Sequence, residues 1–270
     1  MENFTGIMHE GAIKLGLAIT AEQIAQMEFH WRLVNAANRK INLTAIEGEA
    51  EAAEKHYLDS LLPLLLSLKP NLALDLGSGA GFPGLPLAIC RPDWNWILLD
   101  SQEKRGKFLK QAVIELALAN CRVIVSRAEE VGRGILREAC DLVTARAVGS
   151  LNLLAEYALP ILKIGGYFLA LKGPALDSEL KLAQGALAIL GGEIIERREF
   201  VLPFCFEKRS LLLIKKVEQT PEKYPRRLAA KKPIVSRETS RYLSPNGQSH
   251  HKMGLQKTRR QKKWQTNATI

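Results

Sequence analysis

The sequence predicts an α/β protein with a doubly wound, seven-stranded sheet that ends in an antiparallel hairpin. From Leu72 onward, short apolar runs alternate with helical stretches, which is the pattern of a parallel sheet with crossover helices. A glycine-rich segment at residues 77–84 joins the first of these runs to a helix. The last two apolar runs are separated by a short connection, and strands joined in this way pair antiparallel. These three observations define the expected fold class.

Helices are expected before the sheet begins. Apolar residues recur at helical spacing over residues 8–38, and Thr20 with a glutamine three positions later predicts a capping box at the start of the second helix. A further helix is expected over residues 49–68, with His56 and Ser60 on one of its faces. These segments predict an N-terminal helical extension of the sheet domain.

Five strands in βαβ order are predicted for the first part of the sheet. They are expected at residues 72–76, 95–100, 122–126, 141–145 and 167–172. Helices are expected between them at residues 83–90, 103–119 and 151–162, with an irregular segment at 129–138. Gly165 is expected to cap the end of the last of these helices.

The closing part of the sheet separates two classes of doubly wound protein. A helix over residues 175–190 is followed by strand candidates at residues 193–202 and 210–217. A terminal antiparallel hairpin is typical of Rossmann-like class I methyltransferases, whereas the nucleotide-binding half of a dehydrogenase is expected to end in a parallel sixth strand. The hairpin therefore favours the methyltransferase arrangement.

The glycine-rich segment fits two nucleotide-binding patterns. Gly79, Gly81 and Gly84 match the dinucleotide pattern G-x-G-x-x-G, with Asp100 placed 21 residues after Gly79 as a ribose-binding acid. Gly77, Gly79 and Gly81 equally match G-x-G-x-G preceded by an aspartate, the pattern of S-adenosylmethionine enzymes. The glycine spacing alone leaves both ligands open.

Residues that follow the predicted strands are the candidate ligand contacts, because ligands bind beyond the carboxyl ends of the strands in doubly wound sheets. Asp100 is expected to accept the ribose hydroxyls, and Glu129 beside Ala128 is expected to bracket an adenine edge. Arg146 and Lys172 would place two cations at the rim of the site, which favours an anionic substrate.

Composition and motifs exclude several classes of protein. No apolar run approaches the length of a membrane span, and the first ten residues carry acids where a signal peptide carries basic residues, so we expect a cytoplasmic protein without a membrane role. The four cysteines are widely spaced, which predicts free thiols and no metal site. No triphosphate-binding loop motif is present. We expect a monomer.

The positive charge of the chain is concentrated at its C-terminal end. Residues 222–270 contain 13 Lys and Arg against two Glu, whereas the first 221 residues hold 25 basic and 26 acidic residues. A basic end on a neutral body favours a polyanion partner, and the alternative is an extension that only keeps the protein soluble. We therefore expect three parts: helical residues 1–69, a Rossmann-like domain at 70–220, and a basic, partly disordered arm at 221–270.

Several sequence motifs occur together in a defined order. They are, from the N-terminus, NLTAI, HYLDSLL, DLGSGAGFPGLPLAI, LLDSQEKRGKFL, VTARAVGSL, LALKGP and KYPRR followed by KKPI. Over residues 20–235 the chain resembles the GidB (RsmG-like) family of bacterial small-subunit rRNA guanine-N7 methyltransferases. The chain departs from this family after Arg227, where a segment is shorter than in a common family form, and residues 236–270 extend beyond the similarity.

The resemblance implies S-adenosylmethionine-dependent methylation of guanine N7 in the 530 loop of 16S rRNA, as free rRNA or in the small ribosomal subunit. The implied cofactor contacts, together with Gly81 of the loop, are Gly77, Gly79, Phe82, Asp100, Ser101, Gln102, Ala128, Glu129 and Arg146. The positions that the resemblance places toward RNA are His56, Lys172, Arg226 and Arg227.

The implied reaction needs no general base, because guanine N7 offers an in-plane lone pair and carries no proton near neutral pH. Arg146 and Lys172 are therefore expected to orient the substrate and not to accept a proton. Two alternatives remain from the sequence: an RNA-binding or ribosome-assembly factor that holds S-adenosylmethionine structurally, and an NAD-dependent oxidoreductase.

Overall fold

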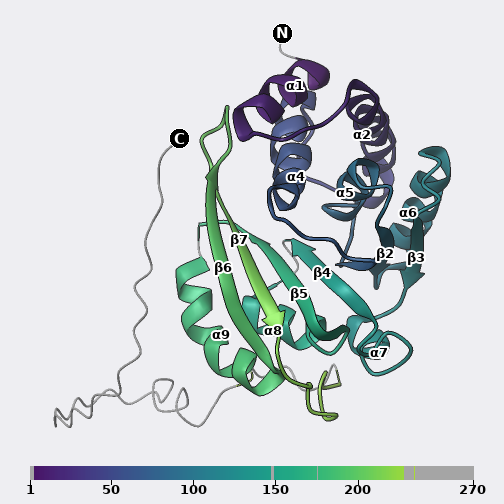
Figure 1. Cartoon of the computed structure of the whole chain (residues 1–270). Helices are drawn as coiled ribbons and strands as arrows, with labels where there is room; N and C mark the ends of the chain where they lie inside the picture. The colour runs from purple at the N-terminus through teal and green to yellow at the C-terminus, as the bar shows by residue number, and fades with distance from the viewer. Residues whose placement is uncertain (1–2, 147–148, 175, 228–233, 235–270) are drawn as a thin grey trace, which may run out of the picture.

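The computed structural model describes residues 3–146, 149–174, 176–227 and 234. One seven-stranded sheet, in the order β3-β2-β1-β4-β5-β7-β6, runs through the middle of the molecule (Figure 1). The strands are Leu72–Leu76 (β1), Asn95–Asp100 (β2), Cys121–Val125 (β3), Cys140–Arg146 (β4), Leu162–Lys172 (β5), Gly192–Val201 (β6) and Lys208–Lys216 (β7). The first five strands are parallel, and β7 pairs antiparallel with both β5 and β6. The predicted sheet and its terminal hairpin are confirmed, with β6 at the edge.

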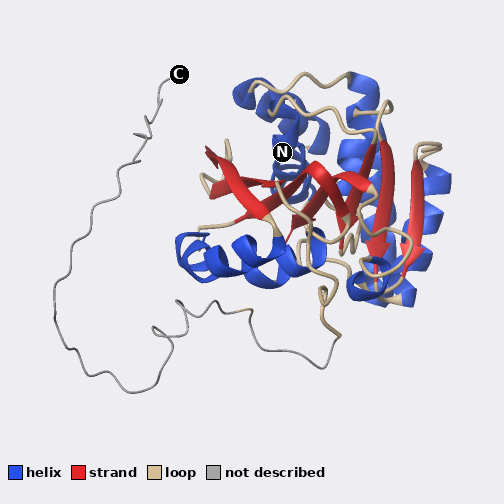
Figure 2. Ribbon diagram, turned by 60° about the horizontal axis from the view of Figure 1, so that its bottom comes forward, coloured by secondary structure: helices blue, strands red, loops and turns tan. Residues whose placement is uncertain are grey.

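Helices cover both faces of this sheet (Figure 2). One face packs against α1 (Phe4–Leu15), α2 (Ala21–Ile41), the helical segment 49–65, α5 (Gly84–Cys90) and α6 (Glu103–Glu115). The other face packs against α7 (Ala128–Val131), α8 (Leu151–Ala158) and α9 (Leu176–Leu190). No helix in the described part of the chain is long and apolar enough to cross a membrane.

The strands contribute alternate side chains to two apolar cores. In β2, Trp96 and Leu98 belong to the core beneath α5 and α6, whereas Ile97 and Leu99 belong to the core beneath α8. Both faces of β2 are buried, which explains why this strand is a continuous apolar run in the sequence. The carboxyl ends of β1 to β5 lie at the same edge of the sheet, where the candidate residues follow them.

The N-terminal helices share a core with the sheet. Met27, Trp31 and Val34 of α2 are buried in the same apolar cluster as Leu85 of α5 and Leu98 of β2. The predicted capping box is present, since the Thr20 hydroxyl accepts from the Gln23 amide and the Gln23 side chain accepts from the Thr20 amide. The N-terminal region therefore forms part of one helical layer of the sheet domain.

The prediction of one regular helix over residues 49–68 is wrong. The segment divides into α3 (Glu49–Ala52), a π-helical stretch η1 (Ala53–Leu58), α4 (Asp59–Leu61) and a 3-10 turn η2 (Leu62–Leu65). In a π-helical turn the backbone hydrogen bond joins residues five apart instead of four. The side chains after the turn therefore point to a different face than they would in a regular α-helix. The Ser60 hydroxyl donates to the backbone carbonyl of His56 (2.5 Å).

The boundary between α8 and β5 also differs from the expectation. α8 ends at Ala158, before Pro160, because proline has no backbone N–H to continue the helical hydrogen bonds. Gly165 was expected to cap this helix but lies within β5, with φ +86°. Lys163 of the same strand pairs with Asp141 of β4 (3.0 Å).

After β7 the chain returns across α7 and α8. The Arg137 guanidinium donates to the carbonyls of Thr220 (2.7 Å) and Tyr224 (2.8 Å). Further along, Arg226 pairs with Glu156 of α8, and the Asn152 side chain donates to the Ile234 carbonyl (3.1 Å). We call residues 218–227 the return segment. The basic residues expected at 236–270 lie outside the described part of the chain.

Candidate active site

The glycine loop between β1 and α5 leaves open space where a ligand would approach. Gly77, Gly79 and Gly81 all have positive φ (72°, 58° and 103°), a conformation that favours glycine. A Cβ added to Gly79 would meet only the Gly77 carbonyl oxygen within 4 Å, at 3.8 Å. A Cβ on Gly84 would instead lie 2.5 Å from Leu98 Cδ2. Gly79 therefore faces a space, whereas Gly84 allows α5 to pack closely on the sheet.

Two carboxylates hold this loop in place. The fully buried Asp75 accepts from the Gly84 amide (3.1 Å) and from the Thr144 hydroxyl (3.0 Å). Asp100, at the end of β2, accepts from the Gly79 amide (2.9 Å). Because both of its oxygens accept hydrogen bonds from other segments, Asp75 is a buried support of the loop. Burial raises the pKa of its carboxyl group to about 6.

A pocket lies where β1, β2 and β3 end. Its lining residues are Leu76, Gly77, Leu99, Asp100, Ser101, Ser126, Arg127, Ala128, Glu129 and Tyr157. Asp100 lies three residues before α6, and one of its carboxylate oxygens accepts from the Gln102 amide (2.8 Å). The structure thus brings together the predicted residues of the glycine loop, of the β2 end and of the β3 end.

Tyr157 is a pocket residue that the sequence analysis missed. It lies on α8 and donates its hydroxyl to Glu129 Oε1 (3.1 Å). Burial and the neighbouring Glu129 raise the pKa of Tyr157 to about 12, so its hydroxyl remains a donor at neutral pH. A tyrosine within an amphipathic helix gave no signal, because its contact depends on how α8 packs beside α7.

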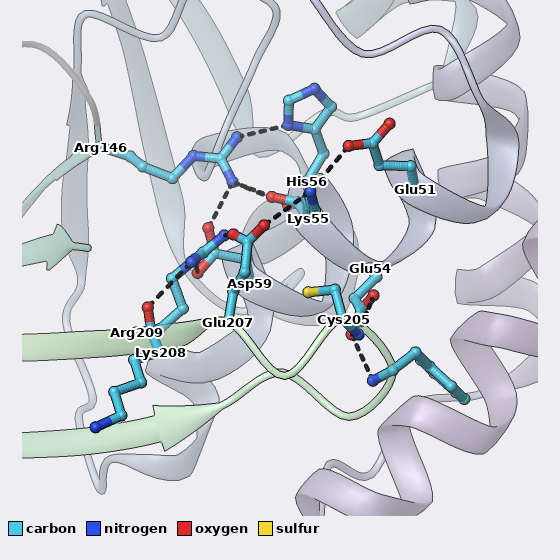
Figure 3. Close-up of polar contacts among 11 residues, drawn as sticks. Glu51, Glu54, Lys55, His56, Asp59, Arg146, Cys205, Glu207, Lys208 and Arg209 are labelled. Atoms are coloured by element: carbon cyan, nitrogen blue, oxygen red, sulfur yellow. Dashed lines mark hydrogen bonds and ion pairs between the residues drawn. The ribbon is translucent and has the colours of Figure 1, made fainter. Parts of the chain in front are cut away.

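Arg146, at the end of β4, is held by the π-helical segment (Figure 3). One guanidinium nitrogen donates to Asp59 Oδ2 (3.0 Å) and to the carbonyls of Lys55 and His56 (both 3.2 Å). The other nitrogen donates to His56 Nδ1 (3.3 Å). The guanidinium carbon lies 5.1 Å from the centre of the Phe82 ring. The sequence placed Arg146 over the site, and the structure adds its acidic and aromatic partners.

The His56 ring is packed against the glycine loop. It stacks on Phe82, with ring centres 4.6 Å apart and planes at 17°, and His56 Nε2 lies 2.7 Å from Thr44 Oγ1. Burial, followed by the charge of Arg146, lowers the pKa of His56 to about 3. His56 is therefore a neutral ring whose two nitrogens both have partners in the protein.

His30 of α2 is a second support that sequence reasoning missed. Its Nε2 donates to the Ala80 carbonyl of the glycine loop (3.0 Å), and its Nδ1 accepts from the Tyr57 hydroxyl (2.9 Å). The side chain is fully buried, which lowers its pKa to about 4. The sequence did contain a signal for this role, because His30 lies among apolar core positions such as Met27 and Trp31. A buried histidine ring needs hydrogen-bond partners for both of its nitrogens.

The other predicted cations differ in their surroundings. Lys172 follows Leu171, the register partner of Arg146, so both cations lie at neighbouring strand ends. Lys172 is 8% exposed and donates to Glu179 and to the Gly149 carbonyl (both 2.7 Å). Arg226 pairs with Glu156 (2.6 Å), and Arg227 is exposed. In the described part of the chain, no cluster of acidic, histidine or cysteine side chains has the form of a metal site.

The sheet order, the inserted antiparallel β7 and the glycine loop at the strand ends define a class I S-adenosylmethionine-dependent methyltransferase fold. The solved structure titled cofactor-bound Rv0187 from MTB is similar, with a TM-score of 0.54 and 18% identity over 72% of this chain and 91% of that chain. This similarity supports the fold. Enzymes of this class use S-adenosylmethionine, which confirms the predicted cofactor.

The family follows from comparison of the sequences. Residues 23–205 match the GidB family, described as rRNA small subunit methyltransferase G. Ribosomal RNA small subunit methyltransferase G of Pelotomaculum thermopropionicum is 47% identical over 221 residues, which cover 81% of this chain and 92% of that protein. The protein of the same name from Desulforamulus reducens is 43% identical over 240 residues, covering 87% of this chain and 100% of its relative. The chain belongs to the GidB family, which confirms the resemblance carried by the motifs.

Proposed function

We propose that this protein transfers a methyl group from S-adenosylmethionine to N7 of a guanine in the 530 loop of 16S rRNA. Membership of the family of rRNA small subunit methyltransferases supports the reaction class and the kind of RNA. The observation that carries the proposal is the pocket that Gly77, Asp100 and Glu129 line, with open space at Gly79, whose amide donates to Asp100. The modified atom and the loop rest on the motif resemblance.

The residues around the pocket fit the chemistry of an adenosine-containing cofactor. Asp100 binds backbone amides through both oxygens, and each carboxylate oxygen retains further lone pairs that suit ribose hydroxyls. Glu129 and Ala128 also line the pocket, and the Glu129 carboxylate with the Ala128 backbone suits an adenine edge. The proposed binding site also includes Gly77, Gly81, Ser101 and Gln102, together with Phe82 and Arg146.

Bound there, S-adenosylmethionine supplies a methyl group that a sulfonium charge activates. The protein has to place the guanine in line with that group and tolerate positive charge on the base. Arg146 serves orientation, and Asp59 balances its charge. The ring nitrogens of His30 and His56 are all engaged within the protein, so neither ring stands as a free proton acceptor. This arrangement suits N7, which has no proton to lose.

The RNA-facing side combines several cations. Lys172, which is paired with Glu179, lies at the strand end next to that of Arg146, and the exposed Arg227 is followed in the sequence by further basic residues. The target base has to be unpaired or displaced from its stack to reach the site, as for other enzymes that modify bases. With 16S rRNA or the small subunit as substrate, the enzyme works in the cytoplasm, and we expect it to act as a monomer.

Methyl transfer with mapping of the product tests this proposal. Small subunits, naked 16S rRNA and free guanosine are incubated with the protein and labelled S-adenosylmethionine, and N7-methylguanine is mapped by reductive strand cleavage. We expect a single cleavage site, in the 530 loop. Label at another atom or loop contradicts the stated target. Binding of S-adenosylmethionine without transfer to any substrate favours an assembly factor, and binding of NAD alone favours an oxidoreductase.

A further inference from the structure

We propose that Thr44, His56 and Asp59 are positioning residues that fix the guanidinium of Arg146 against the glycine loop. These residues belong to the motifs NLTAI and HYLDSLL. The proposed reaction does not by itself explain what these two motifs do. The inference rests on the proposed function, because it assumes that Arg146 orients the substrate or the cofactor.

The π-helical segment supplies part of the binding site for Arg146. In an α-helix every carbonyl within the helix accepts from the amide four residues later, whereas a π-helical turn shifts this partner by one residue. The carbonyls of Lys55 and His56 lie in η1, and both accept from Arg146 (3.2 Å). The irregular helix geometry thus coincides with the place where the guanidinium binds.

His56 adds an acceptor with a defined orientation. A guanidinium only donates hydrogen bonds, so Nδ1 of His56 has to accept from Arg146 and the proton lies on Nε2. Nε2 then donates to Thr44 Oγ1 at 2.7 Å. The Thr44 loop is held in turn by Asn38 of α2, whose side chain donates to the Thr44 carbonyl and accepts from the Thr44 amide (both 2.9 Å). A chain of contacts therefore leads from α2 to Arg146.

Phe82 connects this chain of contacts to the glycine loop. The His56 ring stacks on one side of Phe82, and Arg146 lies 5.1 Å from the same ring. The side chains of His56 and Phe82, from two separate segments, thus define one orientation of the guanidinium. Packing of this kind restricts an arginine to the geometry that its function needs.

Asp59 completes the arrangement from the side of β7. Its Oδ2 accepts from Arg146 (3.0 Å), and its Oδ1 lies 3.4 Å from Nε of Arg209. Glu207 extends the network, because it pairs with both Arg209 and Lys55 (each 2.8 Å). Figure 3 shows these groups around the end of the β6–β7 hairpin. The Asp59 side chain is 7% exposed, so its pairing with the two arginines is shielded from solvent.

The variants Thr44→Val and His56→Phe test the proposal in the full-length protein. Thr44→Val removes the partner of Nε2 and leaves the ring in place, and His56→Phe keeps the stacking on Phe82 but removes both nitrogens. We expect kcat for methyl transfer to fall about 10- to 100-fold in His56→Phe, and less in Thr44→Val, because misplaced catalytic groups cost rates of this order. The control Thr5→Val removes an exposed hydroxyl contact to Glu28.

Double variants separate positioning from general stability. In an Arg146→Ala background, His56→Phe should cause no further loss of kcat, because its effect acts through Arg146. If the losses multiply, or if His56→Phe keeps full activity while Arg146→Ala loses it, the positioning role is overturned. Full activity of Arg146→Ala itself would contradict the role of Arg146 and leave the methyl transfer intact.

The protonation state of His56 provides a readout that is independent of activity. Nitrogen NMR of the labelled protein should show the Nε2–H form, which persists as the pH falls to 5. In Arg146→Ala the pKa of His56 should rise, because the charge of Arg146 lowers it. An Nδ1–H form, or an unchanged titration in Arg146→Ala, would overturn the proposed contact.

Discussion

The carboxyl group of Asp75 is the buried support of the glycine loop, and its titration has a consequence for stability. Burial raises its pKa to about 6, so the folded protein binds this proton more tightly than the unfolded chain, in which an aspartate titrates near about pH 4. The protonated carboxyl therefore contributes its full stabilisation below the pKa of the unfolded chain. This stabilisation is lost as the pH rises through the folded-state pKa of about 6.

We expect Asp75→Asn to remove this contribution to the pH dependence. Between pH 4 and 7, the unfolding free energy of the unchanged protein should fall by roughly 2–3 kcal/mol relative to Asp75→Asn, because the amide does not titrate. Denaturant titrations at a series of pH values measure this difference. Parallel pH curves for the two proteins would disprove the raised pKa, and the exposed Glu222→Gln serves as a control.

Gly79 and Gly16 form a matched pair for testing the cofactor site. Both have positive φ (58° and 71°), and an added Cβ meets at most a carbonyl oxygen at 3.8 Å in one and nothing within 4 Å in the other. We expect alanine at either position to destabilise the fold by about 1–2 kcal/mol, the usual cost of this conformation. Only Gly79→Ala should weaken S-adenosylmethionine binding, by at least about tenfold. Calorimetry measures the affinities, and equal affinities in the two variants would contradict the placement of the cofactor.

At the next level of organisation, the return segment is fixed to α8 and to the connection between α7 and β4. Arg137 holds two of its carbonyls, and Glu156 accepts from the backbone amide and the guanidinium of Arg226. Glu156 is adjacent to Tyr157, which donates to Glu129 in the pocket. Arg226 thus anchors the return segment beside the proposed cofactor site, whereas its neighbour Arg227 is exposed.

This difference predicts separate effects for the two neighbouring arginines. Arg226→Ala should lower the unfolding free energy by about 1–3 kcal/mol, because it leaves the buried Glu156 carboxylate without its charged partner. Arg227→Ala should leave stability unchanged and reduce the slope of log K for RNA against log salt by about one. Thermal unfolding and binding titrations at several salt concentrations measure the two effects. A larger loss of RNA affinity in Arg226→Ala, at unchanged stability, would reverse the assignment.

For the whole molecule, the distribution of charge predicts a function for the C-terminal residues. Residues 236–270 contain eight Lys and Arg against one Glu. Their deletion should weaken binding to 16S rRNA and flatten its salt dependence, because fewer counterions are released from the RNA. The affinity for S-adenosylmethionine should stay the same. An unchanged salt slope would indicate that these residues only contribute to solubility.

The sequence by itself determined the class of fold and the family. Strand periodicity, the glycine loop, the capping box at Thr20 and the closing hairpin are local signals that extend over a few residues, and the backbone follows them directly. The same signals placed Asp100 and Arg146 at the ends of strands and Glu129 shortly after one; in the structure Asp100 ends β2, Arg146 ends β4, and Glu129 lies in α7, after β3. The regular helix at 49–68 was wrong, because its π-helical turn gives no local sequence signal.

The tertiary structure decided which partners these residues have. Arg146 meets Asp59 across 87 positions, Arg226 meets Glu156 across 70, and His30 reaches Ala80 across 50. Such contacts depend on how the N-terminal helices, the sheet and the return segment pack together, and residue spacing does not encode that packing. The sequence placed the cations Lys172 and Arg226 toward RNA, but in the structure they form ion pairs with Glu179 and Glu156. Tertiary packing explains this difference, because charged groups of low exposure need partners of opposite charge.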